Sequence, residues 1–288
     1  MKLLIVGDFH GKLSKSLERK IRKISPDLIL SSGDFCGSKK LEKFIFERIL
    51  WSDKELSELE ELIYLALRRI SFEAGIDLIR KLKKLNIPVL AIRGNWDPSP
   101  FGSDLVGKLS KLEIKESEIF EKVQTKKFRF VDMIVEELGK FILVGGASSS
   151  SPQRVKKNMI KRLMKEDKMS LKEAKDYVSI LQKNWDSRQR LYDKNFREAL
   201  RIKKKTNKKV IFLTHNCPYK SGLDKIKTKS GKKRYVGSYQ ERLVIQKYKP
   251  DIVLCGHIHE NPGKSKVGRS TIHNPGSALN NRFMIMEI

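Results

Sequence analysis

Residues 2–10 read Lys-Leu-Leu-Ile-Val-Gly-Asp-Phe-His: an apolar run, then a glycine, a carboxylate and an imidazole. Apolar and β-branched residues that are bounded by Gly and Asp are typical of a buried strand, here Lys2–Val6. Five later runs have the same character: Leu28–Leu30, Val89–Ile92, Phe141–Val144, Val210–Leu213 and Ile252–Leu254. The pattern predicts a core of short buried strands.

Helical patterns lie between the early strands. In Leu13–Ile24 and in Glu73–Leu85 the apolar residues recur every three or four positions, so each helix has one apolar face. Alternating strands and helices indicate an α/β fold with parallel strands at its centre.

Two further segments are predicted to extend the sheet. Phe128–Leu138 and Phe141–Val144 are joined by Gly139-Lys140, and this arrangement predicts a hairpin. Arg282–Ile288 is predicted to close an edge.

Two segments interrupt the pattern and are predicted to be insertions in a single domain that spans residues 1–288. Lys39–Ile70 is helix-like and rich in both charge signs. Residues 152–209 contain 14 Lys and 6 Arg against 7 acidic residues, a net charge of +13 over 58 positions. Because their apolar residues recur at helical spacing, we expect a basic helical hairpin packed on or beside the core.

Charge is the unusual feature of the composition. The 288 residues include 61 Lys and Arg but 34 Asp and Glu, which gives a net charge of +27. Such an excess attracts polyanions and makes nucleic acid a partner to test. Lys-rich surfaces also occur in soluble proteins without such a partner, and the sequence does not specify the oligomeric state.

Membrane and disulfide-rich classes are disfavoured. No apolar run approaches the length of a membrane span, and the first apolar stretch is too short for a signal peptide. The three cysteines form no CxxC pair, which argues against a disulfide framework and for a reducing compartment. We therefore expect a cytoplasmic protein.

Metal-binding side chain types follow five of the predicted strands. They are Asp8, His10, Asp34, Asn95, His215, His257 and His259. Because the carboxyl ends of parallel strands converge on one crevice, we expect these side chains to meet there.

This donor set indicates a particular kind of metal site. Imidazole nitrogens with carboxylate and amide oxygens suit Mn, Fe, Zn, Ni or Co. Seven donors are too many for one ordinary ion, whereas two ions that share a bridging carboxylate would use them all. Two ions about 3.5–4 Å apart promote in-line displacement at phosphorus. The residues therefore predict a two-metal phosphoesterase.

The order of the motifs also carries a family resemblance. Asp8-x-His10, Gly33-Asp34, Gly94-Asn95-x-Asp97, His215 and Gly256-His257-x-His259 together resemble the calcineurin-like metallophosphoesterase family. The resemblance covers residues 1–143 and 210–288 and implies a four-layer αββα sandwich, to which this chain adds its basic helical insertion.

The same resemblance implies a role for each ligand. Asp8, His10 and His259 would bind one divalent ion, and Asn95, His215 and His257 the other. Asp34 would bridge the two ions, and Asn95 would also contact the phosphate. We expect Mn as the first choice of metal, with Fe, Zn, Ni or Co as alternatives.

Trp96 departs from the family pattern, which commonly reads Gly-Asn-His-Asp or Gly-Asn-His-Glu at this motif. The family histidine is thought to protonate the leaving alkoxide or to position the phosphate. Indole has no proton to give near neutral pH, so a general-acid contribution of typically ~10²–10⁴-fold is lost. We expect poor leaving groups to be disfavoured, and Trp96 to stack on a substrate nucleobase.

The sequence thus predicts a metal-dependent hydrolase in which Asp34 and Asn95 are catalytic. Its substrate would be a phosphodiester, including a cyclic or nucleotide one, attacked by metal-bound hydroxide. Two alternatives stay open. Because of Trp96, the first alternative is a metal-binding scaffold protein with little catalysis. Because of the net charge of +27, the second is a nuclease that acts on nucleic acid.

Overall fold

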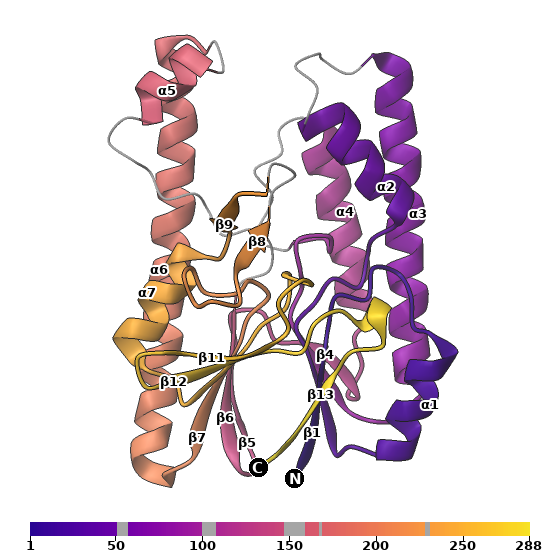
Figure 1. Ribbon diagram of the computed structural model, residues 1–288, viewed down its shortest axis with the longest axis vertical. Coiled ribbons are helices and arrows are strands. Elements are labelled where there is room, and N and C mark those ends of the chain that lie inside the picture. Colours follow the sequence, from indigo (N-terminus) through magenta and orange to yellow (C-terminus); the bar gives the residue numbers. More distant parts are fainter. Residues whose placement is uncertain (51–56, 100–107, 147–158, 167–168, 228–230) are drawn as a thin grey trace.

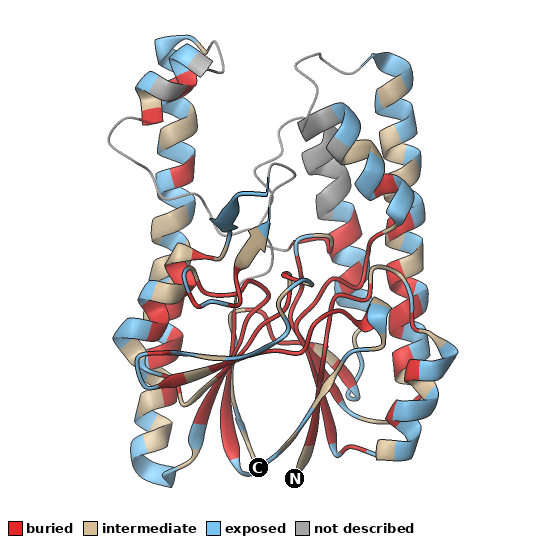
Figure 2. Cartoon of the chain, viewed as in Figure 1, coloured by how far each residue is buried: buried red, intermediate tan, exposed pale blue. Residues whose placement is uncertain are grey.

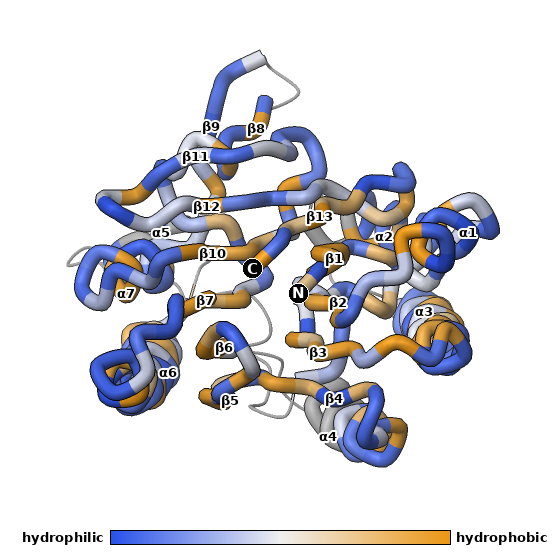
Figure 3. Tube along the Cα trace, turned by 90° about the horizontal axis from the view of Figure 1, so that it is seen from below, coloured by the Kyte–Doolittle hydropathy of each residue, from blue (hydrophilic) through white to orange (hydrophobic). Residues whose placement is uncertain are grey.

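A computed structural model describes residues 1–50, 57–99, 108–146, 159–166, 169–227 and 231–288. Two large sheets face each other, and helices cover the outer face of each (Figures 1 and 3). One sheet has the order β13-β1-β2-β3-β4 and the other β11-β12-β10-β7-β6-β5. The predicted α/β fold with parallel strands, flanking helices and a helical insertion is confirmed.

The first sheet contains β1 (Lys2–Val6), β2 (Leu28–Ser31), β3 (Val89–Ala91), β4 (Phe128–Phe130) and β13 (Met284–Glu287). Its first four strands are parallel, and β13 pairs antiparallel with β1, as predicted for the last residues. On its outer face lie α1 (Lys15–Ile24), α3 (Glu58–Lys83) and α4 (Lys108–Lys122). The short α2 (Lys39–Phe44), followed by a π-helix at Ile45–Leu50, precedes α3.

The second sheet contains β5 (Val135–Leu138), β6 (Phe141–Gly145), β7 (Lys209–Leu213), β10 (Ile252–Leu254), β11 (Gly263–Val267) and β12 (Ser270–Asn274). Strands β6, β7, β10 and β12 are parallel, and β5 and β11 pair antiparallel at the two edges. α6 (Leu171–Thr206) and α7 (Tyr239–Tyr248) cover its outer face. Other short elements are α5 (Met159–Glu166), the hairpin β8 (Lys225–Lys227) with β9 (Lys233–Tyr235), and a 3-10 turn at Ala278–Asn280.

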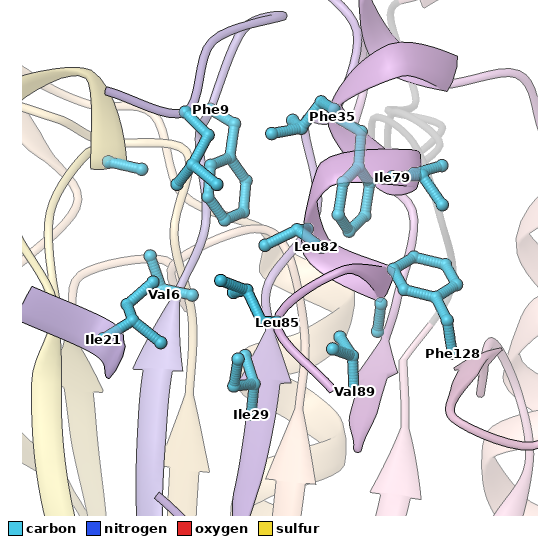
Figure 4. Close-up of a cluster of buried hydrophobic side chains, with 14 of the residues drawn as sticks. Val6, Phe9, Ile21, Ile29, Phe35, Ile79, Leu82, Leu85, Val89 and Phe128 are labelled. Atoms are coloured by element: carbon cyan, nitrogen blue, oxygen red, sulfur yellow. The ribbon is translucent and has the colours of Figure 1, made fainter. Parts of the chain in front are cut away.

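Burial on both faces explains why β1 is apolar without interruption. Leu3 and Ile5 belong to the core between the two sheets, whereas Leu4 and Val6 face the helices. Figure 4 shows the outer cluster, in which Val6 packs with side chains from α1 and α3. A strand that is covered on both faces needs apolar residues at every position.

The predicted hairpin of Phe128–Leu138 with Phe141–Val144 was half wrong. Val135–Leu138 does pair with β6, but Phe128–Phe130 forms β4 in the opposite sheet. The chain crosses between the sheets after Val131, where Met133 has a φ of 53°. A sequence pattern shows both pieces as apolar but does not show that a turn at Met133 separates them.

The two halves of the basic insertion pack in different places. Tyr192, Phe196 and Ala199 on the second half of α6 pack into the core of the second sheet. The first half extends past the strand ends together with α5, where Leu163 and Leu181 form a small separate cluster (Figure 1). No helix in the described ranges is long and apolar enough to cross a membrane.

Candidate metal centre

The seven predicted side chains meet at one end of the molecule. Asp8 and His10 follow β1, Asp34 follows β2, Asn95 follows β3, His215 follows β7, and His257 and His259 follow β10. Three of these strands belong to one sheet and two to the other. Figure 2 shows that the loops at this end are largely buried, like the strands that lead into them.

One group of donors consists of Asp8, His10 and His259. His259 Nε2 lies 3.4 Å from Asp8 Oδ1 and 3.3 Å from His10 Nε2. The other carboxylate oxygen of Asp8, Oδ2, is buried and has no hydrogen-bond partner. A buried carboxylate oxygen without a partner is costly in a folded protein, and a cation would compensate it.

A second group surrounds Asn95. Its Oδ1 lies 2.8 Å from His215 Nε2 and 2.8 Å from His257 Nδ1. Asp34, His215 and His257 also place one ligand atom each within 4.8 Å of the others. Three or four donors that converge from separate loops have the geometry of a cation site.

Asp34 lies between the two groups. Its Oδ2 is 3.8 Å from His10 Nε2 and 3.5 Å from His215 Nε2. One oxygen thus faces both sets of imidazoles. This position fits a carboxylate that bridges two ions, and the donor set fits two divalent ions of the borderline type.

Several backbone positions at this end are strained. Asp8, His10, Asp34 and His257 have φ between 45° and 67°, the left-handed region that costs side-chain-bearing residues of order 1–3 kcal/mol. These residues leave their strands and turn sharply inward. Gly94 is needed for close packing, because a Cβ at this position would overlap the Asp34 carboxylate.

A layer of hydrogen bonds orients the ligands. His215 Nδ1 donates to the Ser32 carbonyl over 2.7 Å, so Nε2 carries a lone pair and faces the Asn95 Oδ1 oxygen, as two ligands of one cation would. Asp97 accepts from the backbone N–H groups of Cys36 and Gly94, each over 2.8 Å. Asp97 therefore joins the turns after β2 and β3 instead of entering the donor groups.

The comparisons with known proteins agree with this geometry. The family model described as calcineurin-like phosphoesterase matches residues 1–261. The chain belongs to the calcineurin-like phosphoesterase family. A search of curated proteins found no significant match to the chain.

Three solved structures are similar to this chain to different degrees. One crystal structure, 14% identical, superposes with a TM-score of 0.60 over 99% of this chain and 94% of the other. TT1561 of Thermus thermophilus has a TM-score of 0.47 at 14% identity, with 99% and 98% of the two chains covered. Phosphopantetheinyl hydrolase (PptH) from Mycobacterium tuberculosis has 0.47 at 12%, with 96% and 89% covered. The first of these likenesses establishes the fold.

Burial keeps His10 and His257 in the neutral form that binds metal, whereas the Asp8 carboxylate raises the pKa of His259 against the effect of burial. Burial lowers the pKa of His10 to about 4 and that of His257 to about 3. Burial also raises the pKa of Asp34 well above its usual range, and the nearby Asp97 and Asp8 carboxylates raise it further. Imidazole binds metal in its neutral form, and a cation beside Asp34 would favour the ionised carboxylate that the metal-free protein disfavours.

Trp96, which we expect to depart from the family motif, borders the centre. Its backbone N–H donates to Asp34 Oδ1 over 2.9 Å, and its ring lies edge-on to His10 with centroids 5.9 Å apart. The ring is half-buried and packs against the outer core cluster. The indole thus lies between His10 and the outer core cluster.

Sequence reasoning missed the contacts of Arg93 that fix the backbone leading to Asn95. The buried Arg93 donates from its backbone N–H to Asp132 Oδ1 over 2.8 Å and from its guanidinium to Asp132 Oδ2 over 2.7 Å. The guanidinium also pairs with Glu121 and lies 4.2 Å from the Phe130 ring centre. These partners are remote in sequence, and no motif links them to residue 93.

A second missed group, Glu241, supports His215. Its carboxylate accepts from Thr214 Oγ1 over 2.5 Å, directly before that histidine. Burial raises the pKa of Glu241 to about 7. A glutamate in the first turn of a helix is common, so no local signal distinguishes this one.

Proposed function

We propose that this phosphoesterase holds two divalent ions and hydrolyses phosphodiester bonds. The observation that carries the proposal is the position of Asp34 Oδ2, which faces His10 on one side and His215 on the other. When bound, two such ions would lower the pKa of a coordinated water and offset charge on the phosphoryl oxygens.

The chain's own residues would position the substrate. Asp8, His10 and His259 would hold one ion, and Asn95, His215 and His257 the other, with Asp34 between them. Asn95 is exposed at the end of its loop, so its amide N–H₂ can donate to a phosphoryl oxygen while Oδ1 faces the histidines. This geometry would orient the ester for in-line attack.

The proposed preference for diesters over monoesters is tested by a direct comparison of two substrates. With Mn²⁺ added, we expect a higher kcat/KM for bis-p-nitrophenyl phosphate than for p-nitrophenyl phosphate. The two substrates share a leaving group, so the comparison isolates the charge and size of the phosphoryl centre. A higher kcat/KM for the monoester would contradict the proposal.

Trp96→His should restore help to poor leaving groups. We expect the variant to hydrolyse diphenyl phosphate up to about 10²-fold faster than the unaltered protein, with little change on bis-p-nitrophenyl phosphate. Phenolate needs a proton far more than p-nitrophenolate does. Trp96→Phe, which alters the packing without supplying an acid, is the matched control. Equal gains in the two variants would show that packing, not proton transfer, is responsible.

A further inference from the structure

The described residues 219–227 and 231–236, here called the basic hairpin, contain β8 and β9 and leave the second sheet after β7. Six of these fifteen residues are Lys or Arg and one, Asp224, is acidic. The Asp224 carboxylate accepts from the backbone N–H groups of Lys220, Gly222 and Gly237 over 2.7, 3.2 and 3.2 Å. The one negative charge is therefore used to shape the turn.

The basic hairpin is fastened to the candidate metal centre at both sides. Ser238 N–H donates to the Cys217 carbonyl over 2.8 Å, which closes the base of the hairpin two residues after His215. Asn261, two residues after His259, donates to the Lys225 carbonyl. Figure 1 shows β8 and β9 rising at the same end as the carboxyl ends of the strands. The hairpin is therefore attached to the two loops that carry His215 and His259.

Four aromatic rings form a row that starts on this hairpin. Centroids are 6.2 Å apart for Tyr235 and Tyr219, 6.0 Å for Tyr219 and Tyr239, and 6.5 Å for Tyr239 and Trp185. Lys220 Nζ lies 5.5 Å from the Tyr219 ring centre. The row joins the hairpin, α7 and α6, which are distant in sequence, so the sequence alone showed little mixing of aromatic and basic residues.

The row is open to solvent at its hairpin end. Tyr235 is 43% exposed, and Lys233 and Arg234 beside it are exposed as well. Tyr219, Tyr239 and Trp185 are half-buried. Packing of the fold does not require an exposed aromatic ring between cationic side chains, whereas a base-bearing polyanion uses both.

We propose that the basic hairpin and the aromatic row bind single-stranded nucleic acid. Lys and Arg would contact the phosphates, and the exposed ring of Tyr235, supported by the rings behind it, would stack with a base. A base can stack on an exposed side chain only when it has left the base stack of a duplex, so this surface favours a single strand. If the bound strand is also a substrate of the adjacent metal centre, that part of the proposal rests on the proposed function.

Binding is tested on the Mn²⁺-loaded protein with fluorescein-labelled oligothymidylate of about twelve nucleotides, carrying hydrolysis-resistant phosphorothioate linkages. We expect fluorescence anisotropy to show binding that weakens steeply between roughly 50 and 200 mM salt. Tyr235→Ala should weaken it by about 5- to 150-fold, because one stacked base is lost. Tyr235→Phe, which keeps the ring, should bind like the unaltered protein.

A matched pair of double variants tests the phosphate contacts. Lys233→Ala/Arg234→Ala removes two charges from the hairpin and should reduce the slope of log affinity against log salt by about 1.4. Lys204→Ala/Lys205→Ala removes two exposed charges near the C-terminal end of α6, which lies far from β8 and β9 (Figure 1). This variant should leave the slope nearly unchanged.

Three results would overturn the inference: no binding at low salt, equal effects of the two double variants, or equal affinity for a blunt duplex. The proposed function is tested by a separate measurement, the hydrolysis of bis-p-nitrophenyl phosphate. A protein that hydrolyses this diester but does not bind the oligonucleotide would refute the hairpin surface alone. One that binds the oligonucleotide but hydrolyses neither that diester nor a phosphodiester-linked oligonucleotide would refute the proposed function alone.

Discussion

Asp34→Asn is expected to lower kcat for bis-p-nitrophenyl phosphate by on the order of 10³-fold or more. Asp34 Oδ1 accepts from the Trp96 N–H over 2.9 Å, and Oδ2 faces His10 and His215. An asparagine that keeps the Trp96 hydrogen bond must turn its N–H₂ toward the bridging position. That group neither binds a cation nor carries negative charge.

The metal-free fold should tolerate this change. Burial raises the pKa of Asp34 well above its usual range, so its charged form costs free energy when no cation is present. The neutral amide of the same shape should therefore leave the melting temperature of the metal-free protein unchanged or higher. Kinetics, metal content per chain and thermal melting would be measured together. Asp77→Asn, on an exposed carboxylate of α3, is the control. Activity within tenfold of the unaltered protein would refute the bridging role.

Arg93→Ala is expected to reduce the free energy of unfolding by about 3–5 kcal/mol. The change leaves the buried Asp132 carboxylate without its cation and uncovers the face of the Phe130 ring. Because residue 93 directly precedes Gly94 and Asn95, activity should fall as well. Urea unfolding measures the loss. Arg80→Ala, at an exposed pair with Asp77, should cost no more than about 1 kcal/mol.

The pH dependence separates loss of charge pairing from loss of packing. The pKa of Asp132 is already raised to about 6 by burial, despite Arg93. Without the arginine the folded-state pKa rises further, so the folded protein holds the proton to higher pH than the unfolded chain does. Stability then falls as pH rises through that pKa. The deficit of Arg93→Ala should be larger near pH 8 than near pH 5, and a constant deficit would contradict the charge explanation.

The strands and the donor residues could be predicted from sequence because each signal is local. The Lys2–Val6 run is apolar at every position since both faces are buried, and Gly-Asp or Gly-His pairs mark where strands end. Together with Gly94-Asn95 and Thr214-His215, these pairs give five strand ends whose order was enough to predict the family, which the comparison confirms. The assignment of the seven residues as ligands stays a prediction that the geometry supports.

The remainder depends on contacts that local patterns do not encode. The turn at Met133 sends β4 and β5 to different sheets, and Arg93 meets Asp132 across 39 positions of sequence. The aromatic row is assembled from three elements in the same way. The predicted insertion 152–209 was treated as one unit, although the second half of α6 packs in the core.

The central claim, a metal-dependent phosphoesterase, is tested most directly by removing and restoring the metal. The protein would be dialysed against a chelator, assayed on bis-p-nitrophenyl phosphate, and assayed again after Mn²⁺ is added. We expect hydrolysis to vanish with the chelator and to return with Mn²⁺, with about two ions bound per chain. Two bound ions without hydrolysis would contradict the account and favour a metal-binding scaffold, for which Trp96 would be the reason.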